Sequence, residues 1–356
     1  MRLELERRSE RSQAMALVSP LIAIALTLLS TAAIFALLGR EPIHALHVYF
    51  IEPLTQTWSL QELVVKAAPL IMIAIGLSLC YLSNNWNIGA EGQYVFGATV
   101  GGGVALAFQG SGSPVALPLV LLAGAAGGAF LAAIPAILKV RFNTNEILTS
   151  LMLVYVAELI LDFLVRGPWR DPAGFNFPQT VTFDTVVPVL IEGSRIHLGS
   201  LFAILAVIGA TLLLGFTLKG FEIRLLGQSP RAARFAGFSP ARMTIFVFLV
   251  SGALAGLAGI CEVAGSMGQL QPAISPGYGF TAIIVAFLGR LNPVGIMIAG
   301  VLLALSYLGG EGAQIALKVP IDVTRVIQGM LLFFVLACDT LILYRLRLVR
   351  NEPRAA

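Results

Sequence analysis

Apolar residues are arranged along this chain in long runs that are separated by short polar segments. A helix of about 20 apolar residues crosses the hydrocarbon core of a bilayer, and ten runs approach or reach that length. They fall near residues 17–39, 63–83, 94–108, 115–138, 147–166, 198–218, 243–265, 279–289, 294–309 and 323–344. The pattern predicts an all-α polytopic membrane protein with about ten transmembrane helices.

Two of the runs, 94–108 and 279–289, are short. Each follows a polar, glycine-rich segment, Asn84–Gln93 before the first and Ser266–Gly279 before the second. Irregular backbone is tolerated at membrane depth only where it is buried in protein or lines a cavity. We therefore expect broken or re-entrant helices at these two places.

The first run follows a charged start, Arg2 to Arg11, and superficially resembles a signal peptide. It is longer than the 7–15 apolar residues of a signal peptide and has no convincing cleavage site. We expect an N-terminal segment at 1–16, a transmembrane permease domain at 17–345 and a tail at 346–356.

Composition excludes a soluble protein, because 57% of the residues are hydrophobic and only 12% are charged, whereas soluble domains carry about 25% charged residues. The net charge of +4 does not indicate nucleic-acid binding, since the basic residues form short clusters without interleaved aromatic residues. The cysteines lie in apolar runs without CxxC spacing, which predicts packing roles and no disulfide framework; they are Cys80, Cys261 and Cys338.

The distribution of Lys and Arg predicts the orientation in the membrane. Sixteen of the 23 basic residues fall in the two termini, the 139–145 loop, the 219–242 loop and Arg290. Basic residues accumulate in cytoplasmic segments. Both termini and the 219–242 loop are therefore expected in the cytoplasm, and the long 167–197 loop outside the cell.

With this topology, spans two to five and seven to ten would be two inverted repeats, each with one interrupted segment. Paired interruptions of this kind indicate a substrate path at the interface between repeats, although no clear residue-level similarity joins the halves. The candidate path residues are Asn85, Asn87, Glu91, Gln93, Gly277, Tyr278 and Phe280.

The polar residues of the first interruption have two interpretations. A carboxylate among membrane helices is costly unless it is paired or hydrated, so Glu91 must face a protein partner, water or substrate. Alternatively, Asn84–Gln93 is a tight turn whose side chains cap two helices. The residues alone leave both interpretations open.

A second polar segment, Asn143–Ser150, stands at the start of the fifth span. Asn143 or Asn145 can cap a helix whose first turn carries Glu146, an arrangement that the helix dipole favours. Capping is a better explanation of this segment than substrate contact.

The 219–242 loop is expected to contain a short helix, with Ser229 as its N-cap, Pro230 at its first position and Gly237 at its end. Arg231, Arg234 and Phe235 would make it a compact amphipathic projection. Such a projection could lie on lipid headgroups or bind in a groove of a cytosolic partner.

Small residues recur at four-residue spacing, at Gly97 and Gly101 and again at Gly252 and Gly256. This spacing permits close crossing of membrane helices. The alternative is that these glycines are merely tolerated in membrane helices.

Three segments, in their order and spacing, resemble the permease family for branched-chain amino acids, ribose and nucleosides. They are the run Asn87-Ile88-Gly89-Ala90-Glu91-Gly92-Gln93, the Asn-Glu-Ile-Leu-Thr-Ser run at 145–150 and the loop Gly227–Arg242. Within this family, the chain is most similar to nucleoside permeases that work with basic-membrane-protein-type lipoprotein receptors. The resemblance covers nearly the whole chain.

The resemblance implies a subunit of an importer in the bacterial inner membrane that moves nucleosides or purine bases by alternating access. Branched-chain amino acids or simple sugars are alternative solutes. The implied partners are a second, paralogous permease subunit, a cytosolic ATPase that holds ATP and Mg²⁺, an external lipoprotein receptor and membrane lipid. The implied ATPase contacts are Gly227, Ser229, Pro230, Arg231, Ala233, Arg234, Phe235 and Gly237.

The residues separately support a division of labour between subunits. A phosphate-binding loop needs Gly-Lys-Ser/Thr, but the four lysines are followed by Ala, Val, Gly and Val. This chain therefore needs a partner ATPase or an ion gradient as its energy source. No catalytic constellation stands out, and His44 and His47 lack the further ligands that a metal site requires.

An ion-coupled secondary transporter is the rival hypothesis, because carboxylates within membrane spans are functional candidates. The candidates are Glu158, Asp162, Glu262 and Asp339. Their expected positions near the ends of spans, where water is close, weaken this hypothesis.

Overall fold

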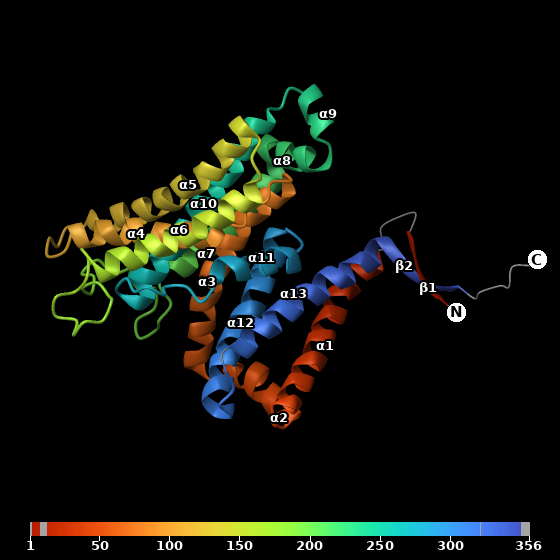
Figure 1. Ribbon diagram of the computed structural model, residues 1–356, viewed down its shortest axis with the longest axis horizontal. Coiled ribbons are helices and arrows are strands. Elements are labelled where there is room, and N and C mark those ends of the chain that lie inside the picture. Colours follow the sequence, from red (N-terminus) through yellow and green to blue (C-terminus); the bar gives the residue numbers. More distant parts are fainter. Residues whose placement is uncertain (1, 8–12, 321, 350–356) are drawn as a thin grey trace, which may run out of the picture. The chain divides into compact units, whose positions relative to one another are not determined.

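The structure of the chain is a computed structural model that describes residues 2–7, 13–320 and 322–349. Within these ranges the fold is almost entirely helical (Figure 1). The α-helices are α1 (Gln13–Leu37), α2 (Pro42–Leu46), α3 (Thr57–Leu82), α4 (Ala90–Ala107), α5 (Ala116–Phe142), α6 (Glu146–Arg166), α7 (Leu198–Phe216), α8 (Leu218–Gln228), α9 (Pro230–Phe235), α10 (Pro240–Glu262), α11 (Tyr278–Leu288), α12 (Pro293–Leu317) and α13 (Asp322–Leu343).

Each of the ten predicted spans coincides with one helix, which confirms the predicted fold class. The helices are α1, α3, α4, α5, α6, α7, α10, α11, α12 and α13. In the described part of the chain, seven of them are long and apolar enough to cross a membrane; α4, α11 and α13 are not among these seven, and α11 has only 11 residues. The chain is thus a multi-pass membrane protein with a short helix, α11, at the second predicted interruption. At the first, α4 has 18 residues and begins at Ala90, inside the predicted Asn84–Gln93 segment.

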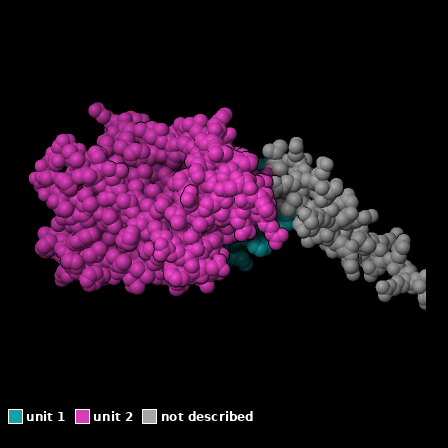
Figure 2. All heavy atoms as spheres, turned by 90° about the horizontal axis from the view of Figure 1, so that it is seen from above, with its two compact units in different colours: residues 1–55, 306–356 teal, residues 56–305 magenta. Residues whose placement is uncertain are grey.

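Two compact units make up the chain, residues 56–305 and a unit formed by residues 1–55 with 306–356 (Figure 2). In the larger unit α4, α5 and α10 run alongside one another (Figure 1). A Cβ atom on Gly97 would lie 2.2 Å from the Cα of Gly256, and one on Gly128 would lie 2.1 Å from the carbonyl oxygen of Gly252. The predicted close crossing of helices is therefore confirmed, because no larger residue fits at these positions.

The smaller unit is built from the first and last helices, where α1 packs against α13. A π-helix, η1 (His47–Ile51), and a 3₁₀ turn, η2 (Glu52–Leu54), follow α2. The Tyr49 hydroxyl is hydrogen-bonded to the Ser306 hydroxyl at 2.8 Å. Phe35 and Tyr49 are both buried in its apolar core.

Two strands that the sequence did not predict join the ends of the chain. β1 (Arg2–Arg7) pairs with β2 (Tyr344–Val349) in antiparallel fashion, with Arg2 opposite Val349. The remaining parts of the predicted 1–16 and 346–356 segments include residues 1, 8–12 and 350–356, which lie outside the described residues.

Candidate functional site

The first break in the helices lies between α3 and α4. The chain turns at Asn84, whose φ of 56° is in the left-handed region, a conformation that Asn adopts more readily than most residues. The Tyr81 hydroxyl then donates a hydrogen bond to the carbonyl oxygen of Asn87 at 3.0 Å. This hydrogen bond satisfies one backbone carbonyl of the break from within the protein.

Asn87 and Gln93 form a reciprocal pair of amides inside the protein. The Asn87 Nδ2 donates to Gln93 Oε1 and the Gln93 Nε2 donates to Asn87 Oδ1, both at 3.0 Å. Asn87 also donates to the Ser251 hydroxyl at 3.1 Å and accepts from the Gly89 N–H at 3.1 Å. Both amides are buried, so their hydrogen bonds close the break onto α10 and the first turns of α4.

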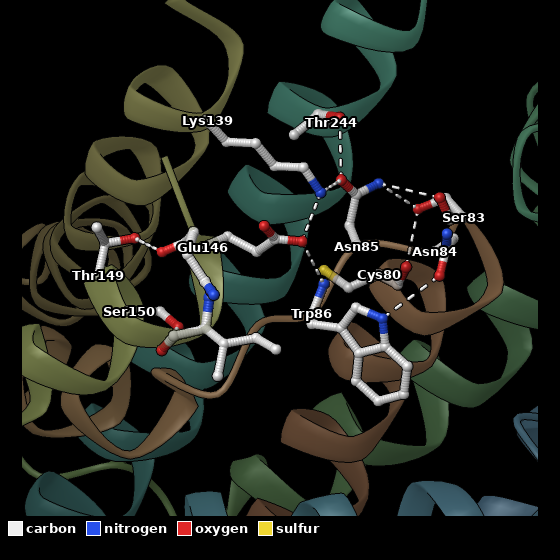
Figure 3. A network of polar contacts seen from close by, with 12 residues as sticks. Cys80, Ser83, Asn84, Asn85, Trp86, Lys139, Glu146, Thr149, Ser150 and Thr244 are labelled. Carbon is white, nitrogen blue, oxygen red and sulfur yellow. Dashed lines mark hydrogen bonds and ion pairs between the residues drawn. The ribbon is translucent and has the colours of Figure 1, made fainter. Parts of the chain in front are cut away.

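Asn85 belongs to a separate polar network that joins α3, α5, α6 and α10 (Figure 3). Its Oδ1 accepts from Lys139 Nζ at 2.9 Å and from the Thr244 hydroxyl at 3.0 Å. Lys139 also forms an ion pair with Glu146 at 2.5 Å. The ammonium group thus lies between Asn85 and Glu146, an arrangement that was not predicted from the sequence.

Glu91 connects the two breaks. Its Oε2 accepts a hydrogen bond from the backbone N–H of Gly279 at 2.5 Å, in the first turn of α11. A Cβ atom on Gly279 would lie 2.2 Å from the backbone nitrogen of Glu91. The starts of α4 and α11 are therefore in direct contact. A carboxylate at a helix N-terminus is favoured by the free N–H groups and by the helix dipole.

The three candidates from the second break have different environments. Gly277 has a φ of 103° and precedes α11. Tyr278 is buried and its ring lies 6.1 Å from that of Tyr94, edge to face. Phe280 is 41% exposed, so it is the one large side chain among the seven path candidates that faces outward from this chain.

An aromatic cluster beside the first break was not identified from the sequence. The rings of Tyr81 and Phe287 are stacked with centroids 5.2 Å apart, and the Trp86 ring lies 5.3 Å from Tyr81. Trp86 is 38% exposed. Trp86 follows two asparagines in a polar segment, which was a usable signal, but Phe287 comes from α11 and only the fold brings it here.

The start of α6 has the geometry of a capped helix. Asn145 Oδ1 accepts from the N–H groups of Ile147 at 2.9 Å and Leu148 at 3.3 Å. Glu146 lies in the first turn and reaches the backbone N–H of Trp86 at 3.4 Å. This segment therefore holds the first break in place from the side of α6.

The 219–242 segment contains two helices rather than the single short helix that was predicted. α8 was missed because Lys219 and Glu222, which form an ion pair at 2.8 Å, interrupt its apolar pattern. α9 begins at Pro230, and the Ser229 hydroxyl accepts from the Ala232 N–H at 3.4 Å as its N-cap. Gly237 follows the helix with a φ of 83°.

The surface of α9 is polar and aromatic. Ala233 is fully buried, whereas Phe235 is 93% exposed and Arg231 and Arg234 are exposed beside it. Figure 1 shows α9 next to α8 at one end of the larger unit. The two arginines and the phenylalanine together form the α9 projection, Arg231–Phe235.

Gly227 gives this segment a direct contact with the first break. A Cβ atom on Gly227 would lie 1.9 Å from the carbonyl oxygen of Leu82, the last residue of α3. Backbone therefore touches backbone where α3 ends. A displacement of α8 must move the end of α3 or open this contact.

Among the described side chains, the carboxylates of the rival hypothesis do not converge on one place. Glu158 is exposed, and Asp162 pairs with Arg166 at 2.7 Å. Glu262 is the last residue of α10 and is partly buried. The side chain of Asp339 lies outside the described part, and within the described residues no group of three or more His, Cys, Asp or Glu side chains could hold a metal ion.

His197 is a buried histidine between the 167–197 segment and α7. Its Nδ1 accepts from the Gly199 N–H at 3.1 Å, and its Nε2 lies 3.3 Å from the Ser266 hydroxyl. Burial lowers the pKa of His197, because desolvation disfavours the charged imidazolium. The neutral form with the proton on Nε2 satisfies both contacts.

Comparisons with known proteins agree with a membrane transport subunit. Residues 59–336 match the family described as the branched-chain amino acid transport system permease component. A glucose ABC transporter permease of Haloferax volcanii is 36% identical over 96% of this chain and 93% of its own length. A guanosine ABC transporter permease of Bacillus subtilis is 30% identical over 90% of this chain and 92% of its own length.

A nucleoside ABC transporter permease of Lactococcus lactis is 29% identical over 89% of each chain. A second nucleoside permease of Lactococcus lactis and a second guanosine permease of Bacillus subtilis also match this chain. The family match covers most of the chain, and the chain belongs to this family of permease components. It is a transport subunit of the ATP-binding-cassette class.

Proposed function

We propose that this chain forms half of the translocation pathway of a nucleoside importer whose ATPase is a separate protein. The observation that carries the proposal is the contact between Gly227 and Leu82. Gly227 lies in α8, directly before the exposed α9 projection, so this backbone contact joins the segment that carries the projection to the first break. A cytosolic ATPase that binds the projection would thereby displace the end of α3 and the start of α4.

The path residues divide into a frame and a lining under this proposal. Asn85, Asn87, Glu91 and Gln93 are buried and hydrogen-bonded to the protein, so they hold the two breaks together. Gly277 and Tyr278 set the start of α11. Phe280, which is 41% exposed, is the candidate for direct solute contact.

Nucleosides suit such a lining because their bases stack on aromatic rings. The guanosine and nucleoside permeases among the relatives support this choice. Glucose is the second candidate, favoured by the 36% identity to a permease named for that sugar. The Phe280 ring can pack against either solute, so the chemistry of the lining alone does not separate them.

The partner proposals follow from the same geometry. The matching second permeases of two bacteria support a paralogous permease as the partner across the pathway. The pairing of β1 with β2 supports placing both termini on one side, and the basic residues favour the cytoplasm for that side. The 167–197 loop would then face the external receptor.

Uptake of labelled solutes tests this function. Cells with and without the gene would be supplied with guanosine, uridine, glucose, ribose and leucine, before and after a protonophore at maintained ATP. Loss of nucleoside uptake on deletion, with resistance to the protonophore in the wild type, is expected. If deletion abolished glucose uptake alone, glucose would be the transported solute instead. If the protonophore abolished uptake while ATP stayed constant, the transporter would be ion-coupled.

The coupling role has its own test in the assembled complex. Arg234→Glu combined with Phe235→Ala should abolish receptor-stimulated ATP hydrolysis, since it reverses a charge and removes the exposed ring of the projection. Arg141→Glu is the matched control, because Arg141 is also exposed but lies at the end of α5. Wild-type stimulation in the double variant would contradict the coupling role of α9.

A further inference from the structure

The 167–197 segment is bonded to the second break along a strap, Gln179–Val187. The Thr180 N–H donates to the Leu270 carbonyl at 3.1 Å, and the Phe183 N–H donates to the Gly268 carbonyl at 2.8 Å. The Val187 N–H donates to the Ala264 carbonyl at 2.9 Å. The strap therefore lies antiparallel to residues 264–270, from the π-helix η3 (Val263–Met267) that continues α10 into the second break, without forming a regular strand.

Side chains strengthen this attachment. The Thr180 hydroxyl accepts from the Leu270 N–H at 3.1 Å, so these two residues are joined in both directions. The Gln269 amide donates to the Gln179 amide oxygen at 3.2 Å. Thr180, Phe183 and Leu270 are buried, which protects their hydrogen bonds from competition with water.

The same strap is bonded to the far end of α4. Gln109 Nε2 donates to the Thr182 carbonyl at 2.9 Å, and the Gly110 N–H donates to Asp184 Oδ2 at 2.7 Å. The Asp184 N–H returns a hydrogen bond to Gln109 Oε1 at 3.3 Å. The strap thus bridges the end of α4 and the second break.

Packing joins these parts along the length of α4. A Cβ atom on Gly102 would lie 2.6 Å from Leu270 Cδ1 and 3.3 Å from Phe183 Cζ. At the opposite end of the break, Gly279 is bonded to Glu91 in the first turn of α4. The second break is therefore held to α4 at both of its ends, and the strap makes one of the two attachments.

We propose that the strap, α4 and the second break, Ser266–Gly279, move as one rigid body that transmits the docking of an external protein to the start of α11. Packed elements held at several points move together rather than deforming. The inference rests on the proposed function, because the external protein is the solute receptor of the importer. Thr180 and Gln179 are positioning residues in this body.

Cross-linking tests the rigid body directly. In a background without the native cysteines, Gln179→Cys and Gln269→Cys would be joined by a short bifunctional thiol reagent in the reconstituted complex. Because the two positions keep their separation in a rigid body, receptor-stimulated ATP hydrolysis and uptake should stay within roughly twofold of the untreated complex. Abolition of both activities by the cross-link would overturn the proposal.

Cutting the attachment is the complementary test. Thr180→Val removes the hydroxyl that binds Leu270 and should lower receptor stimulation by roughly five- to tenfold, the order expected for one buried hydrogen bond, while basal hydrolysis is unchanged. Thr182→Val is the matched control, since the Thr182 side chain is exposed and only its carbonyl binds Gln109. Thr180→Ser keeps the hydroxyl and should restore stimulation.

Equal stimulation in Thr180→Val and Thr182→Val would overturn the rigid body while leaving the importer proposal intact. Absence of receptor-stimulated hydrolysis in the wild-type complex would instead refute the proposed function. If Thr180→Val failed to fold, the cross-linking result would decide the question alone.

Discussion

The amide pair of Asn87 and Gln93 allows a quantitative test of whether the first break is a structural turn. Asn87→Leu leaves both amide atoms of Gln93 without the partners they have now, at 1% exposure. Each buried polar group that loses its partner costs about 1–3 kcal/mol. For the Gln93 amide alone, we therefore expect Asn87→Leu to lower the free energy of unfolding by about 2–6 kcal/mol. The Gly89 N–H and the Ser251 hydroxyl also lose their hydrogen bonds to Asn87, and this further loss is the same in the single and the double variant.

The double variant Asn87→Leu with Gln93→Leu should recover part of this loss, because it removes both members of the pair. Replacing two bonded polar groups by apolar groups is often nearly neutral. We expect a coupling energy of about 2 kcal/mol, in the range seen for residues in contact. Overpacking by the leucine side chain at position 87 affects the single and the double variant alike, so it cancels in the cycle.

Equilibrium unfolding in mixed micelles of a mild detergent and dodecyl sulfate would measure these free energies, with uptake of labelled guanosine measured in parallel. A double variant as unstable as the sum of the two single variants would refute the structural interpretation of the pair. A stable double variant that no longer transports would instead indicate that these amides contact the solute.

Three further predictions concern packing, charge and pH. Gly128→Leu should prevent folding, since a Cβ atom there would lie 2.1 Å from a backbone carbonyl oxygen of α10. The control Gly209→Ala should fold normally, because no atom lies within 4 Å of a Cβ atom at that position. Size-exclusion chromatography distinguishes folded from aggregated protein. Lys139→Met should destabilise the protein by about 1–3 kcal/mol by leaving its carboxylate partner unpaired, and adding Glu146→Gln should recover part of this loss in thermal unfolding. His197 has a lowered pKa in the folded protein, so the unfolded chain binds the proton at a higher pH and the free energy of unfolding should fall as the pH drops below about 6.5. Unfolding measured from pH 8 to 5 should show a weaker dependence of this free energy on pH in His197→Gln. The same dependence in the variant and the wild type would contradict the assignment.

The membrane helices could be predicted because they depend on local composition. An apolar run of bilayer length forms a helix wherever it occurs, since the backbone has no other partners in lipid. The caps at Asn145 and Ser229 were also predictable, because a cap depends on residues within one turn. Helix α8 could not be found this way, since the charges of Lys219 and Glu222 hide its apolar face.

The contacts that define the candidate site are not local. Glu91 and Gly279 are 188 positions apart, and no periodicity in either segment indicates that they meet. The sequence analysis counted Lys139 only among the basic residues of the 139–145 loop, although its ammonium group donates a hydrogen bond to Asn85. The sequence showed that these polar groups needed partners, and the fold determined which partners they have.

Glu91 lies where the two proposed routes of motion meet. One route runs from α9 through Gly227 to the end of α3, and the other runs from the strap to the second break. If α8 displaced the start of α4, Glu91 would either carry α11 with it or release the buried Gly279 N–H, which would cost about 1–3 kcal/mol. This hydrogen bond therefore favours movement of α11 together with the start of α4. An ATPase on one face and a receptor on the other would thus act on the same helix start, and neither would need to contact the solute.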